Sequence, residues 1–197
     1  MEKDKIKIET KRLFIRVVKN ADVTDEYVSG LNDPEVNKYM CLRGHQQTKE
    51  TVRAYVHSHY NSPNSILLGL FTKGQNRLIG TVGLSGMSYF HYCMGLGICL
   101  FLRDYWRKGL GCEALVGIKN FVFSELGFHF IEAGIYDENT SSIKLFERAG
   151  FEFYQRIEDK YRYEDRFVSV LAYRAINNNF KFPLQEGCNE YIGSGRN

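Results

Sequence analysis

A basic, glycine-containing turn is the first feature of this sequence that could do chemistry. Residues 106–112 have the sequence Trp-Arg-Lys-Gly-Leu-Gly-Cys, between an apolar run and a segment with helical spacing. Glycines let the backbone approach a ligand, and the first amides of a helix present free N–H groups at the positive end of its dipole. The turn therefore predicts an anion site that suits a pyrophosphate, although basic glycine turns also occur on surfaces without a ligand.

The same glycines also fit a dinucleotide-binding fingerprint. Gly109, Gly111 and Ala114 match GxGxxA, and Glu132 follows at about the distance of a ribose-binding acid. However, such a fingerprint normally follows the first strand of a series of βα units, whereas an antiparallel meander precedes this one. A Walker-type nucleotide hydrolase is also disfavoured, because no glycine-lysine-serine or glycine-lysine-threonine motif is present.

A second polar segment opens a later helical stretch. It has the sequence Asn-Thr-Ser-Ser-Ile-Lys-Leu-Phe-Glu-Arg-Ala-Gly-Phe, from Asn139 to Phe151. Asn139 and Ser142 stand at the predicted helix start, where both residue types are good caps and need no ligand. The residues alone therefore favour a structural role for this pair.

The elements that must position these residues follow from hydrophobic period and turn residues. Strands are predicted over residues 13–18, 66–72, 78–86, 93–102, 128–136, 151–156 and 166–173. Helices are predicted over residues 21–40 (two short pieces broken at 32–34), 48–60, 109–126 and 140–149. The strand, turn, helix and strand over residues 93–136 form a parallel crossover, while the earlier strands form an antiparallel meander.

Composition bounds the class of protein. The chain has 197 residues with 44% hydrophobic and 25% charged content and a net charge of +3, so nucleic-acid binding is not expected. Its five cysteines show no zinc-binding spacing, so we expect reduced thiols and no metal site. With no export signal and no apolar stretch long enough for a membrane span, a cytoplasmic protein is expected. We predict one domain over residues 1–174 and a C-terminal tail over 175–197 that is flexible or docks on a neighbour.

Two motifs at this separation resemble the GNAT superfamily of acetyl-CoA-dependent N-acetyltransferases. The glycine turn is similar to its Q/R-x-x-G-x-G/A loop, with Trp106 in the place of Gln or Arg, and segment 139–151 is similar to N-x-x-S-x-x-x-Y-E-K-x-G-F. Trp106 and the pair Glu113-Ala114 resemble the Rim-type branch, which acetylates ribosomal proteins. The resemblance runs from about residue 9 to residue 173. It implies an α/β fold of the α+β type, with a mostly antiparallel mixed sheet, one splayed parallel pair and flanking helices.

The resemblance also implies how the site would work. Acetyl-CoA would be held by a group of residues in the turn, the preceding strand and the later helix: Phe101, Arg107, Lys108, Gly109, Leu110, Gly111, Cys112, Asn139 and Ser142. A backbone N–H near Leu100 would stabilise the oxyanion formed when an amine attacks the thioester. Phe146 departs from the family, because many members carry a tyrosine there as the general acid. Ser142 is the alternative proton donor.

The base and the acceptor stay open at this point. Candidate bases are Glu132, which we favour, and Glu138, Glu158, Asp159, His91 and His129. Residues 22–60 and 87–92 are expected to line the acceptor cleft, with Arg43, His45, Tyr89 and His91 as candidate contacts. The acceptor is a primary amine on a protein N-terminus or a small molecule, or alternatively an amino-sugar nucleotide. A non-catalytic CoA-binding module is the rival class, and we expect a monomer or a homodimer.

Overall fold

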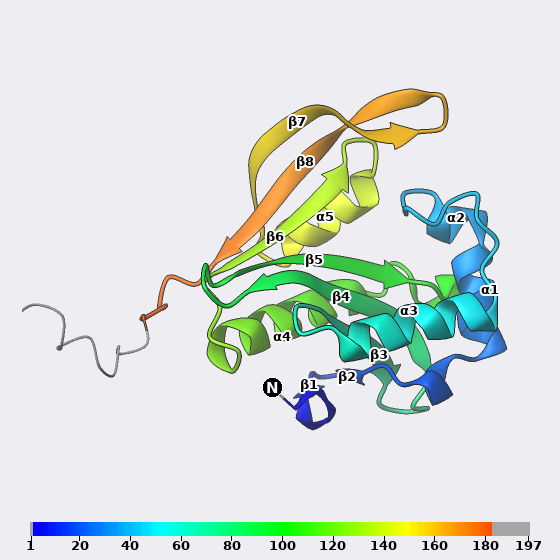
Figure 1. Cartoon of the computed structure of the whole chain (residues 1–197), viewed down its shortest axis with the longest axis horizontal. Coiled ribbons are helices and arrows are strands. Elements are labelled where there is room, and N and C mark those ends of the chain that lie inside the picture. The colour runs from blue at the N-terminus through cyan, green and yellow to red at the C-terminus, as the bar shows by residue number, and fades with distance from the viewer. Residues whose placement is uncertain (1, 183–197) are drawn as a thin grey trace, which may run out of the picture.

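The computed structural model describes residues 2–182, which form one mixed sheet with helices on both faces (Figure 1). The strands are β1 (Lys7–Glu9), β2 (Leu13–Val17), β3 (Ile66–Thr72), β4 (Leu78–Ser88), β5 (Cys93–Leu100), β6 (Phe130–Tyr136), β7 (Glu152–Tyr163) and β8 (Arg166–Ile176). The α-helices are α1 (Asp25–Asn32), α2 (Pro34–Asn37), α3 (Lys49–Asn61), α4 (Leu110–Ser124) and α5 (Thr140–Arg148). Single 3₁₀ turns lie at Lys3–Lys5, Asn20–Asp22 and Arg103–Tyr105.

The sheet has eight strands in the order β1-β2-β3-β4-β5-β6-β8-β7. Every pairing is antiparallel except that of β5 with β6, which is parallel, as the crossover pattern predicted. The parallel pairing spans only Cys93–Gly95 against Phe130–Glu132, and beyond it the two strands diverge (Figure 1). The predicted mixed α/β fold with one splayed parallel pair is therefore confirmed.

Two hydrophobic clusters cover the two faces of this sheet. One cluster joins α4 and α5 to the sheet through residues such as Leu115 and Phe146. The other joins α1 and α3 to the opposite face and contains Tyr27 and Val56. Neighbouring residues of β3 fall into different clusters, as expected when successive side chains of a strand point to opposite faces. In the rest of the text, the face covered by α4 and α5 is called the helical face. The face covered by α1 and α3, where the acceptor cleft was expected, is called the acceptor face.

The last strands differ most from the sequence-based expectation. β7 reaches Tyr163, well beyond the predicted end at residue 156, and its pairing with β8 is interrupted by two register shifts. These shifts and the largely exposed, polar sequence of β7 remove the two-residue period by which a strand is recognised. β8 runs to Ile176, which pairs with Phe130, so the first two residues of the predicted tail belong to the sheet. Residues 183–197 of that tail lie outside the described part of the chain.

Within residues 2–182, none of the helices combines the length and the apolar character that a membrane crossing requires.

Candidate active site

The N-terminus of α4 exposes backbone amides that no part of the described chain caps. Gly109, the N-cap residue, adopts the left-handed conformation with φ of 75° and has no side chain to offer. The first intrahelical bond of α4 runs from the N–H of Glu113 to the carbonyl of Gly109 at 3.1 Å. The amides of Leu110, Gly111 and Cys112 precede this bond and therefore have no acceptor within the helix.

The other α-helices begin differently. The side chains of Thr24, Asp33, Thr48 and Asn139 accept hydrogen bonds from backbone amides at the starts of α1, α2, α3 and α5. Such caps satisfy amides that water or a ligand would otherwise bind. Among the α-helices of residues 2–182, α4 is therefore the one whose first-turn amides remain available to a hydrogen-bond acceptor outside the helix. Arg107 and Lys108, both exposed, lie directly before it.

Two residues of the connection between β1 and β2, Thr10 and Arg12, hold this turn in place. The carboxylate of Glu113, in the first turn of α4, accepts bonds from the Thr10 hydroxyl at 2.6 Å and from the Arg12 amide at 2.6 Å. The Arg12 guanidinium donates from Nε to Glu113 at 2.7 Å and from Nη1 to the carbonyl of Lys108 at 2.8 Å. Partial burial alone would raise the pKa of Glu113, but these hydrogen bonds outweigh it and lower the pKa below its ordinary value.

We expect the Glu113→Gln variant to lose about 1–2 kcal/mol of unfolding free energy at pH 7, because charge-assisted hydrogen bonds are lost. Since folding lowers the pKa of Glu113, its contribution is present above the unfolded-state pKa and disappears as the pH falls through the carboxylate range, about pH 4. Urea unfolding at pH 7 and at about pH 3.5 measures both, and the difference between wild type and variant should shrink at the lower pH. An equal difference at both values would contradict the role of the ionised carboxylate.

The gap between β5 and β6 exposes the backbone of β5. The N–H groups of Phe101 and Leu102, which follow β5, both donate to the carbonyl of Ile79, at 3.1 and 3.3 Å. At the start of β5 the carbonyl of Tyr92 accepts from the N–H of Phe130 of β6 at 3.0 Å, so even-numbered residues of β5 bond toward β6 and odd-numbered residues toward β4. Because successive residues of a strand direct their backbone N–H and C=O groups to opposite sides, those of Ile98 and Leu100 point toward β6. The parallel pairing has already ended at Gly95, and within the described chain β6 offers Ile98 and Leu100 no strand partner. The indole N–H of Trp106 donates to the carbonyl of Leu100 at 2.8 Å.

The structure places the side chain of Phe101, whose backbone was expected to contact the cofactor, in the core of the acceptor face. Its ring is 2% exposed and stacks on Tyr27 with the centroids 4.3 Å apart. The cause is the parity of the β4–β5 pairing, which turns the backbone of residue 101 to β4 and that of Leu100 to the gap.

The start of α5 lies against the glycine turn. A Cβ atom at Gly111 would be 3.3 Å from Leu145 of α5 and 3.4 Å from Leu100 of β5, so the three elements meet there. Asn139 accepts the Ser142 N–H through Oδ1 at 3.1 Å, which is the capping role that its position suggested. The side chain of Ser142 is half-buried. Phe146 packs edge-on against Phe151 and is 3% exposed, so it is a core residue.

Glu132 is the last residue of β6 to pair with β5, and it lies where the gap opens. Its neighbours Ile131 and Ala133 belong to the helical face, so the side chain of Glu132 lies on the acceptor face. There it accepts a hydrogen bond from the hydroxyl of Tyr154. Burial and the adjacent carboxylate raise the pKa of Tyr154 to about 12, so the phenol keeps its proton and donates at neutral pH.

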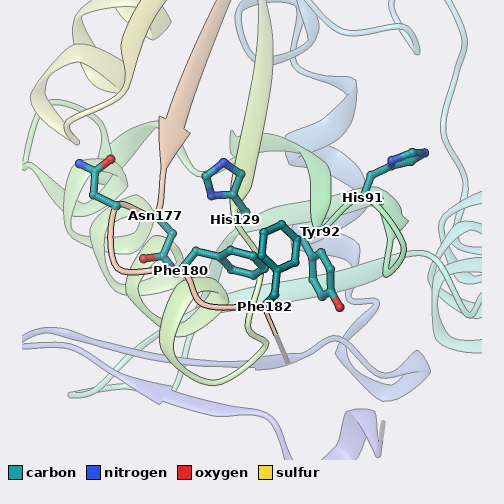
Figure 2. A pocket seen from close by; sticks show the side chains of 7 residues that line it. His91, Tyr92, His129, Asn177, Phe180 and Phe182 are labelled. Atoms are coloured by element: carbon teal, nitrogen blue, oxygen red, sulfur yellow. The ribbon is translucent and has the colours of Figure 1, made fainter. Parts of the chain in front are cut away.

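The other candidate bases are engaged or lie elsewhere. Glu138 pairs with Arg166 at 2.6 Å, and Glu158 pairs with Arg156 at 2.6 Å. His91 and His129 line a pocket with aromatic residues before the starts of β5 and β6, at the opposite end of these strands from the gap (Figure 2). Tyr89, a predicted acceptor contact, lies at that end against Phe128 as well. Asp159 lies in the second register shift of β7.

Comparison with known proteins defines the class of protein first. Residues 12–152 match the family described as the acetyltransferase (GNAT) domain, and the chain therefore belongs to the GNAT acetyltransferases. The uncharacterised N-acetyltransferase YoaA of Bacillus subtilis (strain 168) is 25% identical over 147 residues, which cover 74% of this chain and 82% of YoaA.

Two solved structures share the fold. Ribosomal-protein-S5-alanine acetyltransferase from Vibrio fischeri superposes with a TM-score of 0.73 at 20% identity, over 89% of this chain and 99% of its own. Spermidine N-acetyltransferase from Vibrio cholerae, solved with CoA and spermine, superposes with a TM-score of 0.74 at 18% identity, over 83% of this chain and 95% of its own. This chain is accordingly an acetyl-CoA-dependent acetyltransferase of the GNAT family.

Proposed function

We propose that this enzyme transfers the acetyl group of acetyl-CoA to a primary amine by direct attack within a ternary complex. The main support for the donor site is the uncapped first turn of α4, where the amides of residues 110–112 would hold the pyrophosphate. The exposed side chains of Arg107 and Lys108 add positive charge at the same place. Acetyl-CoA supplies an acyl group already activated as a thioester.

Residues around the gap stabilise the oxyanion and transfer the protons. The backbone N–H groups of Ile98 and Leu100 point into the gap, where they bind the thioester oxygen and stabilise the negative charge that forms on it. Glu132 takes the proton that the amine nitrogen loses as the nitrogen–carbon bond forms and the carbon–sulfur bond breaks. Ser142, beside the α5 cap, is our candidate to return a proton to the leaving sulfur.

We further propose that the chain belongs to the Rim-type branch. Support comes from Trp106, whose indole bonds the end of β5, and from Glu113, whose carboxylate holds the turn. We also propose that the chain up to the end of β8 at Ile176 holds the whole catalytic domain, and that the enzyme is a cytoplasmic monomer or homodimer without metal. Branch membership alone leaves protein N-termini, small amines and amino-sugar nucleotides as acceptors.

Calorimetric titration of the purified protein with acetyl-CoA, CoA, NADH and ATP tests the donor site. We expect micromolar binding of acetyl-CoA and CoA, and much weaker binding of NADH and ATP. Absence of acetyl-CoA binding would overturn the assignment of residues 106–112. If acetyl-CoA binds and a broad panel of amines releases no CoA, the protein is instead a CoA-binding module.

A further inference from the structure

A cluster of four tyrosines stands beside the reaction gap on the acceptor face. It comprises Tyr39 after α2, Tyr136 of β6, and Tyr161 and Tyr163 of β7; we call it the tyrosine cluster. The centroids of the contacting rings lie 5.4–6.0 Å apart. Tyr136 shares the acceptor face with Glu132, because the two residues are four positions apart in one strand. The rings therefore lie on the same face as the carboxylate that we propose as the base, about 13 Å farther along β6.

The sheet beside this cluster carries no side chains at two central positions. Gly97 of β5 and Gly134 of β6 are both exposed, although central strands of a sheet covered by helices are normally buried. A Cβ atom at Gly97 would meet nothing within 4 Å, and one at Gly134 would lie 3.2 Å from the side chain of Val170 and 3.7 Å from the hydroxyl of Tyr161. The last pair of β5 with β6 is Gly95 with Glu132, and the same register continued by two residues would bring Gly97 level with Gly134 across the gap. A flat group could thus lie on bare backbone with the tyrosine cluster as its wall.

Two of the four cations around the cluster are paired with carboxylates, whereas Lys38 and Arg174 have no carboxylate partner among the described residues. The guanidinium of Arg43 stacks on Tyr163 at 3.9 Å and pairs with Glu164 at 2.7 Å. Arg166, 5.4 Å from the same ring, pairs with Glu138 at 2.6 Å. Lys38 lies exposed 5.3 Å from the Tyr39 ring. Near Glu132, Arg174 lies over the Tyr154 ring at 5.3 Å.

These charges discriminate among amine acceptors. A nucleotide-linked sugar carries two phosphates, which are best bound by several arginines free of carboxylates, whereas only Arg174 of the three arginines named above is free of one. A polyamine carries several ammonium groups, which call for several available carboxylates, whereas Glu138 and Glu164 are both held by arginine. Aromatic faces and one carboxylate suit a single ammonium group joined to a flat apolar body.

Resting on the proposed acetyl transfer, we infer that the acceptor is a monoamine carried on an aromatic or similarly flat apolar group. Its flat body lies over Gly97 and Gly134 against the tyrosine cluster, and its amine reaches the gap beside Glu132. Tyr39 and Arg43 on the α2 side contact Tyr163 and Glu164 on the β7–β8 hairpin, and these contacts close one end of this surface.

Release of CoA from acetyl-CoA tests this inference with four kinds of amine: tyramine and phenethylamine, spermidine, glucosamine, and a short peptide with a free N-terminus. We expect kcat/KM for the two aromatic amines to exceed the others at least about tenfold, because only these amines carry a ring that packs against the tyrosine cluster. Faster transfer to spermidine, glucosamine or the peptide overturns it. Acetyl-CoA binding without transfer to either aromatic amine also overturns it and leaves the donor site intact, whereas loss of acetyl-CoA binding contradicts the proposed function itself.

Single-residue variants test where on this surface the flat group of the acceptor binds. Tyr161→Ala should raise KM for tyramine about tenfold while the Kd of acetyl-CoA stays within about twofold. Tyr89→Ala is the matched control, because Tyr89 is also half-exposed but lies at the far end of β5. Gly97→Ala, whose added methyl group would meet nothing within 4 Å, leaves the wall intact and should raise the same KM by placing that methyl group on the floor. Unchanged KM in both Tyr161→Ala and Gly97→Ala would overturn the placement.

Discussion

The Gly109→Val variant is expected to bind acetyl-CoA at least about a hundredfold more weakly than the wild type while still folding. Gly109 holds φ of 75°, a conformation that is strained for any L side chain and most strained for a β-branched one. Valine would pull the turn toward negative φ and place two methyl groups next to the amides of residues 110–112. An anion bound by backbone amides loses most of its binding energy when those amides turn away.

Gly127 provides a matched control for backbone strain. It is likewise exposed and left-handed, with φ of 68°, but it follows the C-terminal end of α4, and a Cβ there would meet nothing within 4 Å. Gly127→Val should cost a similar amount of stability, about 1–2 kcal/mol. Its affinity for acetyl-CoA should match the wild type in calorimetry. Equal losses of affinity in both variants would mean that strain, and not the position of Gly109, explains the effect.

Gly111 is a poorer site for this test. A side chain there would press on Leu145 and Leu100, whose atoms would lie 3.3–3.4 Å from its Cβ, so valine would disturb the packing of α5 and β5 as well as the amides. A change in affinity would then have two causes that calorimetry cannot separate. Gly109, whose nearest neighbour is the flexible end of Arg12 at 3.5 Å, avoids this problem.

Local sequence patterns sufficed to predict the elements around the donor site. The apolar spacing of Leu110, Ala114, Leu115 and Ile118 defines the buried side of α4, and all four are buried. Thr48 and Asn139 cap their helices as their residue types suggested. The parallel crossover followed because a strand, a helix and a second strand of this length connect in that way. These features depend on neighbours within a few residues, which a single sequence contains.

Features that depend on pairing between residues far apart in the chain could not be predicted from the sequence. The bond between Arg12 and Glu113 joins residues 101 positions apart, and nothing near either residue indicates it. Whether residue 100 or 101 faces the gap depends on which of them bonds to β4, a matter of one residue in register. The tyrosine cluster likewise gathers rings from three segments, one of them in a strand whose register shifts conceal its period.

Glu132→Gln should lower kcat by about a hundredfold or more, within the range that general bases contribute, while leaving acetyl-CoA affinity unchanged. Glu132 lies where β5 and β6 part, on the acceptor face, and the Tyr154 hydroxyl fixes its orientation. Glutamine keeps the size and the hydrogen bond but cannot take the amine proton. Steady-state release of CoA with any amine that the wild type acetylates measures the loss.

A pH profile distinguishes a base from a structural residue. If Glu132 accepts the proton, its replacement changes the acid limb of the kcat/KM profile, whereas a purely structural loss scales the whole curve. Tyr154→Phe should weaken the effect of Glu132 without abolishing it, because it removes the orienting bond but keeps the carboxylate. Glu125→Gln, on the exposed end of α4, controls for the loss of a charge. A kcat for Glu132→Gln within about threefold of the wild type would exclude the carboxylate as the base and direct the search to water held in the gap.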